Sequence, residues 1–157
     1  MTHSSQISEE TQVSSAKTPR QIWERAIRHQ VTRDIDGWAN SFAVDGAMEL
    51  PFTPEGLPRR LAGRAVIRDT LGPFWERATK MDRKIIGHEH VVVHETHDPE
   101  VAVIEFDALG EAAGKPFRVS YVHVVHAREG RIVLLRDYFD TAVLNARIKA
   151  DAAPGAT

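Results

Sequence analysis

The spacing of hydrophobic residues changes near residue 80 and divides the chain into a helical part and a strand part. Before that point, apolar residues recur every three or four positions, which is the period of an amphipathic helix. After it, apolar and polar residues alternate, which is the period of a strand with one buried face. Helices followed by a run of strands are typical of an α+β protein.

The helical part predicts three helices with recognisable end signals. Pro19 suits the first turn of the first helix, and Thr18 suits its N-terminal cap. The second helix should end at Asp45-Gly46, and Pro73 should kink or break the third. The predicted elements are helices at about 19–31, 34–45 and 64–79, a short strand at 47–52, a proline-rich loop at 51–60 and a final helix at about 141–150.

The strand part predicts an antiparallel sheet, because its four segments are separated by breaks short enough for hairpins. The segments are 83–95, 101–109, 117–127 and 131–139. A curved sheet wrapped around the helices would leave a cavity between the two layers. We therefore expect one cone-shaped α+β domain over residues 19–150, between a disordered tail at 1–18 and a frayed end at 151–157.

Composition narrows the possible functions. The chain of 157 residues carries 20 basic and 22 acidic residues, a net charge of −2, which does not indicate a nucleic-acid-binding surface. The absence of cysteine excludes thiol catalysis and disulfides and suits a reducing cytoplasm. The sequence contains no apolar run of membrane-spanning length and no secretory signal pattern. We expect a cytoplasmic protein that binds neither nucleic acid nor membrane.

Asp137, in the segment 136–140, is the strongest candidate for a functional acid. Val133, Leu135 and Phe139 flank it at strand period, so its side chain should share their apolar face. A carboxyl group that has lost solvation on such a face suits a general acid or base near neutral pH. The alternatives are a helix-capping role or a salt bridge to an arginine such as Arg136 or Arg118.

Turn signals predict an approximate register for the last strands. If residues 128–130 form a three-residue loop with glycine in the left-handed conformation, Tyr121 lies opposite Asp137. If Gly110 flanks the preceding loop, Glu105 lies opposite Tyr121. A slip of one residue in either loop would break this row. The neighbours of the row would be Asp107, Val119 and His123.

Two interpretations stay open for the other polar residues of these strands. Glu105 and Asp107 alternate with apolar residues, so simple patterning places them in solvent rather than in the row. Tyr121 and His123 share a face. A tyrosine hydroxyl can donate to an oxyanion and a neutral histidine can move protons, but both also suit a half-buried strand.

Three histidines of the segment 83–95 raise the question of a metal site. His88, His90 and His94 fall on one face of the predicted strand. Metal sites usually add a carboxylate or a thiolate at a defined spacing, and no such spacing occurs here. A cluster at a sheet edge or subunit contact fits the pattern better, so we predict no metal.

Several segments resemble a known family. They are Asp-Gly at 45–46, Met-Glu-Leu-Pro-Phe at 48–52, Pro-Arg-Arg-Leu-Ala-Gly-Arg at 58–64 and Gly-Arg-Ile-Val-Leu-Leu-Arg-Asp-Tyr-Phe-Asp at 130–140. Over about residues 20–150 the chain is similar to the SnoaL-like branch of the nuclear-transport-factor-2 superfamily. This resemblance implies the cone-shaped fold, one of many reactions, and often a homodimer. A homodimer would use the outer sheet face, with Arg118, Val122, Val124, His126 and Arg136.

Within that superfamily, the phenazine-biosynthesis A/B proteins share the layout from His94 to Glu105 and carry an acid at the position of Asp137. Their pocket histidine and serine correspond to positions near Thr70 and Phe74, where the residue types differ. Phenazine chemistry is therefore not expected from the resemblance.

Limonene epoxide hydrolase shares the Arg-Asp-Tyr-Phe-Asp stretch, and its two catalytic aspartates correspond to Asp137 and Asp107. Its catalytic arginine corresponds to Glu105, and its water-binding tyrosine and asparagine correspond to Met48 and Leu50, so its mechanism is not expected. The resemblance still implies that these strand residues face one cavity: Glu105, Asp107, Val119, Tyr121 and Asp137.

We predict an enzyme without a cofactor that moves protons on a hydrophobic small molecule of secondary metabolism, by cyclisation, isomerisation or dehydration. A non-catalytic binding or scaffold protein and an epoxide or lactone hydrolase are the alternatives. The predicted catalytic residues are Asp137, Tyr121, His123, Asp107 and Glu105. The predicted substrate-binding residues are Trp38, Phe42, Met48, Leu50, Phe52, Phe74, Leu109, Val119, Leu135 and Leu144.

Overall fold

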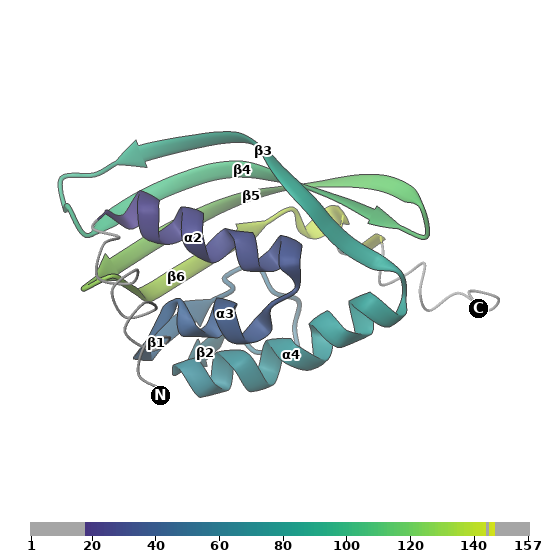
Figure 1. Cartoon of the computed structure of the whole chain (residues 1–157), viewed down its shortest axis with the longest axis horizontal. Helices are drawn as coiled ribbons and strands as arrows, with labels where there is room; N and C mark the ends of the chain where they lie inside the picture. The colour runs from purple at the N-terminus through teal and green to yellow at the C-terminus, as the bar shows by residue number, and fades with distance from the viewer. Residues whose placement is uncertain (1–17, 144, 147–157) are drawn as a thin grey trace, which may run out of the picture.

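Two layers build the part of the protein that the computed structural model describes, which is residues 18–143 and 145–146 (Figure 1). One layer is a curved six-stranded sheet, and helices pack against its inner face. The helices are α2 (Pro19–Thr32), α3 (Ile35–Asn40) and α4 (Arg64–Lys80). The strands are β1 (Phe42–Glu49), β2 (Arg60–Ala62), β3 (Arg83–Glu95), β4 (Val101–Ala112), β5 (Lys115–Arg128) and β6 (Arg131–Phe139).

The strands lie in the order β2-β1-β6-β5-β4-β3. β3 to β6 form the predicted antiparallel meander, and the predicted α+β fold is confirmed. β1, however, pairs with β6 in parallel, which the hairpin pattern did not predict. A parallel pair needs a long connection, and the segments from β2 to β5 supply it here.

The helix starts follow the sequence signals, but one helix end does not. Thr18 caps α2 in a capping box with Gln21, as its position before Pro19 predicts. α3 stops at Asn40, and β1 then begins at Phe42, so the helix predicted to continue to residue 45 is wrong. Pairing with β6 buries residues of β1 in the core, and this tertiary contact outweighs the local helical spacing. α4 continues through the predicted break at Pro73.

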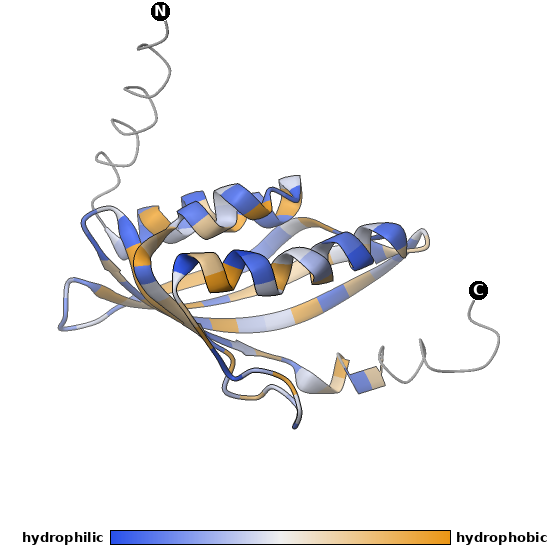
Figure 2. Cartoon of the chain, turned by 90° about the horizontal axis from the view of Figure 1, so that it is seen from below, coloured by the Kyte–Doolittle hydropathy of each residue, from blue (hydrophilic) through white to orange (hydrophobic). Residues whose placement is uncertain are grey.

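The core lies between the helix layer and the sheet. Figure 2 shows hydrophobic and hydrophilic residues interleaved along helices and strands, so each element has one face to bury. Burying one large apolar side chain contributes about 1.5–3 kcal/mol. The largest fully buried apolar side chains are Trp23, Trp38, Phe42, Ile22, Ile67, Ile104, Ile132, Leu135 and Val125.

The register predicted for β5 and β6 is wrong by two residues. The turn has only two residues, because Glu129 and Gly130 both adopt positive φ (51° and 75°) and Arg128 pairs with Arg131. A bulge after Ile132 then shifts the pairing by one more residue. Asp137 therefore lies opposite His123 rather than Tyr121. Since two one-residue shifts restore the alternation, Asp137 stays on the same face as Tyr121 and His123.

The register predicted for β4 and β5 is wrong by one residue, which reverses the face. Glu105 lies opposite Val122, and Phe106 lies opposite Tyr121. The cause is a tight turn at Ala113-Gly114, shorter than the loop expected from the sequence. Glu105 and Asp107 therefore lie on the outer face of the sheet, where simple patterning placed them, and not in a row with Tyr121 and Asp137.

Some expectations concern residues at the chain ends. The predicted tail, the frayed C-terminus and Leu144 lie outside the described residues. Helical structure begins at Thr141, where the final helix was predicted. Within residues 18–143 and 145–146, no helix combines the length and the apolar character needed to cross a membrane.

Candidate active site

A buried histidine–aspartate pair lies on the inner face of the sheet. His123 of β5 and Asp137 of β6 are cross-strand partners, and their side chains are only 1% and 11% exposed. His123 Nε2 and Asp137 Oδ1 are 3.3 Å apart. Neither atom makes a well-aligned hydrogen bond to another described residue, although both are fully buried. Buried polar atoms without good partners are rare, and they often mark functional sites.

Trp23 of α2 orients the imidazole from the opposite layer. Its Nε1–H donates to His123 Nδ1 at 2.9 Å. An indole nitrogen can only donate, so Nδ1 must be the acceptor. In the neutral imidazole the proton is therefore on Nε2, which faces Asp137. Packing α2 on the sheet thus sets the tautomer of a residue 100 positions away in the sequence.

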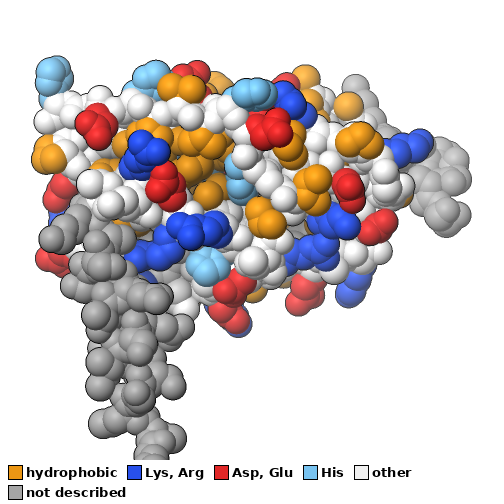
Figure 3. All heavy atoms as spheres, turned by 45° about the horizontal axis from the view of Figure 1, so that its top comes forward, with side chains coloured by type: hydrophobic (Ala, Val, Ile, Leu, Met, Phe, Trp, Pro, Cys, Tyr) orange, Lys and Arg blue, Asp and Glu red, His pale blue; other side chains and the backbone are white. Residues whose placement is uncertain are grey.

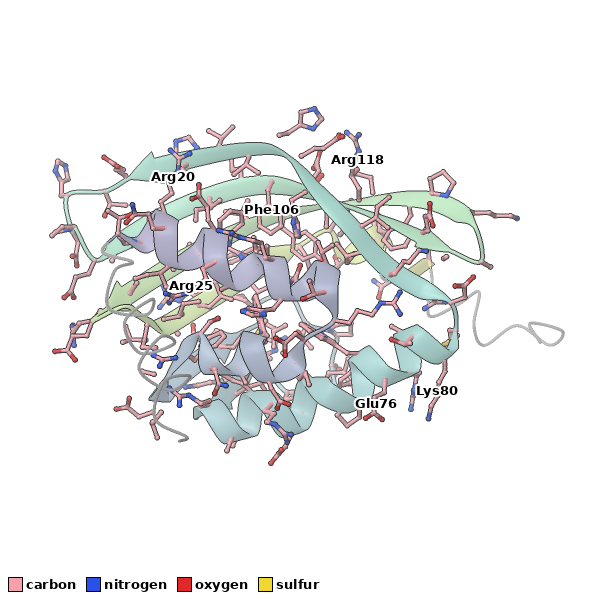
Figure 4. All side chains as sticks on the ribbon, viewed as in Figure 1. Arg20, Arg25, Glu76, Lys80, Phe106 and Arg118 are labelled. Carbon is pink, nitrogen blue, oxygen red and sulfur yellow. The ribbon has the colours of Figure 1, made fainter. Side chains whose placement is uncertain are left out.

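Aromatic rings enclose this pair. The ring centroids of Phe106 and Tyr121 lie 4.7 Å and 5.9 Å from that of His123, both in edge-to-face contact. Phe106 and Tyr121 also stack on one another at 5.2 Å. In Figure 4, Phe106 lies between α2 and the sheet. Apolar rings on several sides exclude water, which strengthens electrostatic interactions within the pair.

Asp137 also borders a pocket of about 430 Å³, within the range of small-molecule sites. Because Oδ1 is fully buried, the remaining exposure of Asp137 belongs to the rest of its side chain. The pocket wall combines the amphipathic Tyr121 with apolar side chains, which are Leu71, Phe74, Trp75, Ala78, Ile85, Phe117, Val119, Phe139 and Val143. Its polar lining consists of Gln30, Arg33, Thr79, Arg83, Lys84, Asp137 and Asp140.

The predicted substrate-binding residues fall into three groups. Phe74 and Val119 line the pocket beside Asp137. Seven others lie elsewhere because packing against neighbouring elements buries them or turns them away; substrate contact by these residues stays a prediction. Trp38, Phe42, Met48 and Leu135 are core residues, and Leu50 packs against the core. Phe52 lies against Tyr138 in a separate outer groove, and Leu109 lies opposite Arg118 on the outer face.

The outer-face acids are engaged in exposed ion pairs. Asp107 accepts a hydrogen bond from Ser120 Oγ at 2.7 Å and lies 2.9 Å from His90 Nδ1 and 3.3 Å from Arg118. The Ser120 hydroxyl and the His90 ring hold the pKa of Asp107 below its usual value. Glu105 contacts His94 at 2.6 Å. Figure 3 shows histidines and charged side chains along the upper edge of the molecule, where β3 lies in Figure 1.

A bulge in β3 separates the three histidines that were predicted to share a face. His90 has a φ of 52°, and the register shifts between Glu89 and Val92. His88 therefore points inward to Gln30 at 3.2 Å, while His90 and His94 contact outer-face acids. Burial, with repulsion from a charged His123, lowers the pKa of His88 to about 4. Among the described residues, no group of three potential metal ligands occurs.

Sequence reasoning missed Trp23 and the charged pocket lining. Trp23 was not among the predicted site residues, although a tryptophan in a predicted helical core needs a partner for its buried N–H, which is a signal that the sequence offers. Arg33, Arg83 and Lys84 carry no motif, and only the approach of α2, α4 and β3 brings them to one opening.

Comparison with known proteins identifies the family: residues 23–135 match the SnoaL-like domain, and the chain belongs to this family. It is 28% identical over 118 residues to the uncharacterised protein YesE of Bacillus subtilis, covering 74% of this chain and 77% of YesE. It is 29% identical over 123 residues to the uncharacterised PhzA/B-like protein PA3332 of Pseudomonas aeruginosa, covering 77% and 83% of the two chains.

Solved structures show the same nuclear-transport-factor-2-like fold. A Bacillus subtilis protein whose name suggests an isomerase superposes with a TM-score of 0.72 at 24% identity, covering 89% of this chain and 95% of that one. A Xanthomonas campestris protein whose name suggests a polyketide cyclase has a TM-score of 0.62 at 17% identity, covering 83% and 96%. A phenazine biosynthesis-related protein of Pseudomonas aeruginosa has a TM-score of 0.60 at 20% identity, covering 87% and 85%.

Proposed function

We propose that the protein is a cofactor-independent acid–base enzyme that isomerises, cyclises or dehydrates a hydrophobic small molecule. One observation carries the proposal: the Asp137 carboxyl borders an apolar pocket and is backed by a buried histidine whose tautomer Trp23 sets. The names of the Bacillus and Xanthomonas structural neighbours, which suggest an isomerase and a polyketide cyclase, are compatible with this class of reaction.

The reaction needs one group that both removes and returns a proton. In our proposal the pocket-side oxygen of Asp137 takes a proton from a carbon next to a carbonyl group and delivers it to another atom of the same molecule. His123 Nε2–H faces the other oxygen and steadies the carboxylate while it is charged. Trp23 keeps that proton in place because its own N–H occupies the position at Nδ1.

Polar groups beside Asp137 favour catalysis over passive binding. A pure binding pocket would need only apolar walls and a single orienting group. Here Tyr121 and Gln30 line the same pocket as Asp137. In our proposal, the Tyr121 hydroxyl or the Gln30 amide donates to the enolate oxygen that forms when the proton leaves.

The same geometry argues against the hydrolase alternative. Holding an attacking water between two acids requires a second carboxyl group close to Asp137. Glu105 and Asp107 lie on the other face of the sheet. Asp140 lines the pocket, but its Oδ1 accepts a hydrogen bond from the backbone N–H of Ala142 at 3.0 Å.

The cellular setting is also a proposal. We propose that the enzyme works as a cytoplasmic homodimer, with the outer face of β5 and β6 as the contact. Val122, Val124 and Arg136 lie on that face and are only half-buried in the single chain. One chain has a mass of 17.5 kDa, and light scattering should report twice that mass. A monomer would contradict this assignment.

Asp137→Asn tests the proposed reaction. Incubation with aromatic polyketides and terpenoid ketones in D₂O, followed by NMR, measures the exchange of protons next to carbonyl groups. We expect Asp137→Asn to lower the exchange rate by at least about 100-fold, the size of a typical general-base contribution. The matched control is Asp107→Asn, which removes an outer-face carboxylate and should leave the rate unchanged. Equal rates for wild type and Asp137→Asn, with the fold intact, would overturn the proposal.

A further inference from the structure

Three cationic side chains line the mainly apolar pocket beside Asp137. Arg33, Arg83 and Lys84 line the opening, where the end of α2 and the start of β3 approach α4. The whole chain has a net charge of −2, so three cationic side chains around one opening depart from the average of the surface. Clefts lined by one sign of charge attract ligands of the opposite sign.

Arg33 has a backbone conformation that other residue types adopt more readily. It caps the C-terminus of α2 with a φ of 56°, a left-handed conformation for which glycine or asparagine is preferred. Its side chain reaches towards α4, where Nη1 lies 3.5 Å from Thr79 Oγ1. Backbone strain retained at a pocket lining residue points to a functional reason for the side chain.

The acids near Arg33 in sequence are engaged elsewhere. Asp34 pairs with His29, and Asp36 pairs with Arg68. Within the described residues, Arg33 forms no ion pair with a carboxylate. Its guanidinium therefore keeps its charge available to a ligand at the mouth of the pocket.

Two acids, Asp137 and Asp140, stand against the three cations of the lining, which leaves an excess of one positive charge. Lys84 lies 3.3 Å from Glu111, but both side chains are more than a third exposed, and such pairs are weak and exchangeable. Asp137 is turned to His123, and Asp140 accepts a hydrogen bond from the backbone of the following helical turn.

We infer that the substrate is an amphipathic carboxylate: its apolar ring system fills the pocket beside Asp137, and its carboxylate binds Arg33 at the mouth with support from Lys84. This inference rests on the proposed function, because it assumes that the pocket beside Asp137 holds the substrate. The planar guanidinium fork matches a carboxylate in two parallel hydrogen bonds. Anchoring the anion at the mouth leaves the ring carbons, rather than the charged group, next to the acid.

A matched pair of probes tests the inference. 2-Naphthoate and 2-naphthamide have the same ring system and nearly the same shape, but only the first is charged. Calorimetric titration of the wild type at low salt should give a Kd for naphthoate at least about 10-fold lower than that for naphthamide, as expected for one charge-assisted hydrogen-bond pair. The ratio should shrink as salt is added.

Arg33→Gln should remove most of the preference for naphthoate and leave the affinity for naphthamide unchanged. Arg77→Gln is the matched control, because Arg77 is an exposed arginine of α4 outside the pocket lining. Arg33→Gly adds a separate readout. It relieves the left-handed strain, so the melting temperature should rise while the preference is lost.

Three results would overturn the inference: equal affinities of the wild type for both probes, a preference that survives Arg33→Gln, or no binding of either probe. Asp137→Asn separates this inference from the proposed function. If only the proposed reaction fails, Asp137→Asn keeps both the proton-exchange rate and the preference for naphthoate. If only the present inference fails, Asp137→Asn abolishes exchange while the two probes bind equally.

Discussion

Two faces of one sheet carry histidine–carboxylate pairs, and they differ in almost every physical respect. On the inner face, His123 and Asp137 are buried, 3.3 Å apart and poorly aligned, with the histidine held by Trp23. On the outer face, His94 and Glu105 are 2.6 Å apart, and each side chain is more than half exposed. The better-formed pair is the one in solvent.

In the proposed function, burial rather than pair geometry distinguishes the catalytic pair from the outer one. Water screens the outer charges, so such a pair contributes about 0–1 kcal/mol to stability. The inner pair loses its solvation, and a folded protein tolerates such imperfectly satisfied groups where function requires them. A list of short histidine–carboxylate distances would therefore favour the outer pair over the buried pair that we propose to be catalytic.

The largest expected effect is a difference in proton-exchange rate between variants of the inner and the outer histidine. His123→Asn should lower the proton-exchange rate by about 100-fold or more, because it removes the group behind the base. His94→Gln should leave the rate within about twofold of wild type, since its side chain is screened by solvent on the far face. NMR exchange in D₂O measures both. A larger loss in His94→Gln than in His123→Asn would reverse the functional assignment of the faces.

Trp23→Phe should have the next largest effect, on stability. It deletes the N–H that donates to His123 Nδ1 and leaves a buried acceptor unpaired, at a cost of about 1–3 kcal/mol in the free energy of unfolding. The matched outer-face change is Ser120→Ala, which removes the hydroxyl that donates to the partly exposed Asp107. It should cost less than about 1 kcal/mol, since water replaces the hydroxyl. Urea denaturation compares them, and equal costs would contradict the distinction.

His88 predicts a pH effect on stability. Its pKa is about 4 in the folded chain and about 6.5 in the unfolded one, so the unfolded chain binds more protons between these values. The free energy of unfolding should therefore fall as the pH drops from about 6.5 to 4, by about 1–2 kcal/mol after allowance for partial solvent screening. Urea denaturation at several pH values measures this loss. His88→Gln should flatten the profile over this range, and an unchanged profile would exclude His88 as the cause.

The smallest effect is expected for the outer pair itself. Glu105→Gln removes one charge of an exposed pair and should change the free energy of unfolding by less than about 0.5–1 kcal/mol at physiological salt. Repeating the urea titration at low and high salt sharpens the test, because screening should remove whatever difference remains. A loss above about 2 kcal/mol in the free energy of unfolding would mean that solvent screening does not limit the contribution of the outer pair.

Local patterns predicted the elements of this protein well. The period-two alternation located β3 and β6 at their observed bounds, and the cap at Thr18 located the start of α2. The apolar flanks of Asp137 placed it on the inner face, where it lies. These features depend on a residue and its close neighbours, so the sequence contains them directly.

The sequence predicted the pairing register of the strands, and the sheet face on which each side chain lies, less reliably. Each turn and bulge inserts or removes one residue, and a shift of one residue moves every side chain to the other face of a strand. Two such shifts cancelled at Asp137, whereas a single shift moved Glu105 and Asp107 outside. The bulge at His90 likewise separated histidines that looked equivalent.

By itself the sequence determined the α+β class, the order of the helices and of strands β3 to β6, and the apolar surroundings of Asp137. Only the tertiary structure decided which residues accompany that acid. Trp23 and His123 are 100 positions apart and meet because α2 packs on β5, and Arg33 reaches the pocket because α2 ends opposite α4. Hydrophobic spacing is a local property of the chain, whereas contacts between layers depend on how buried surfaces fit together.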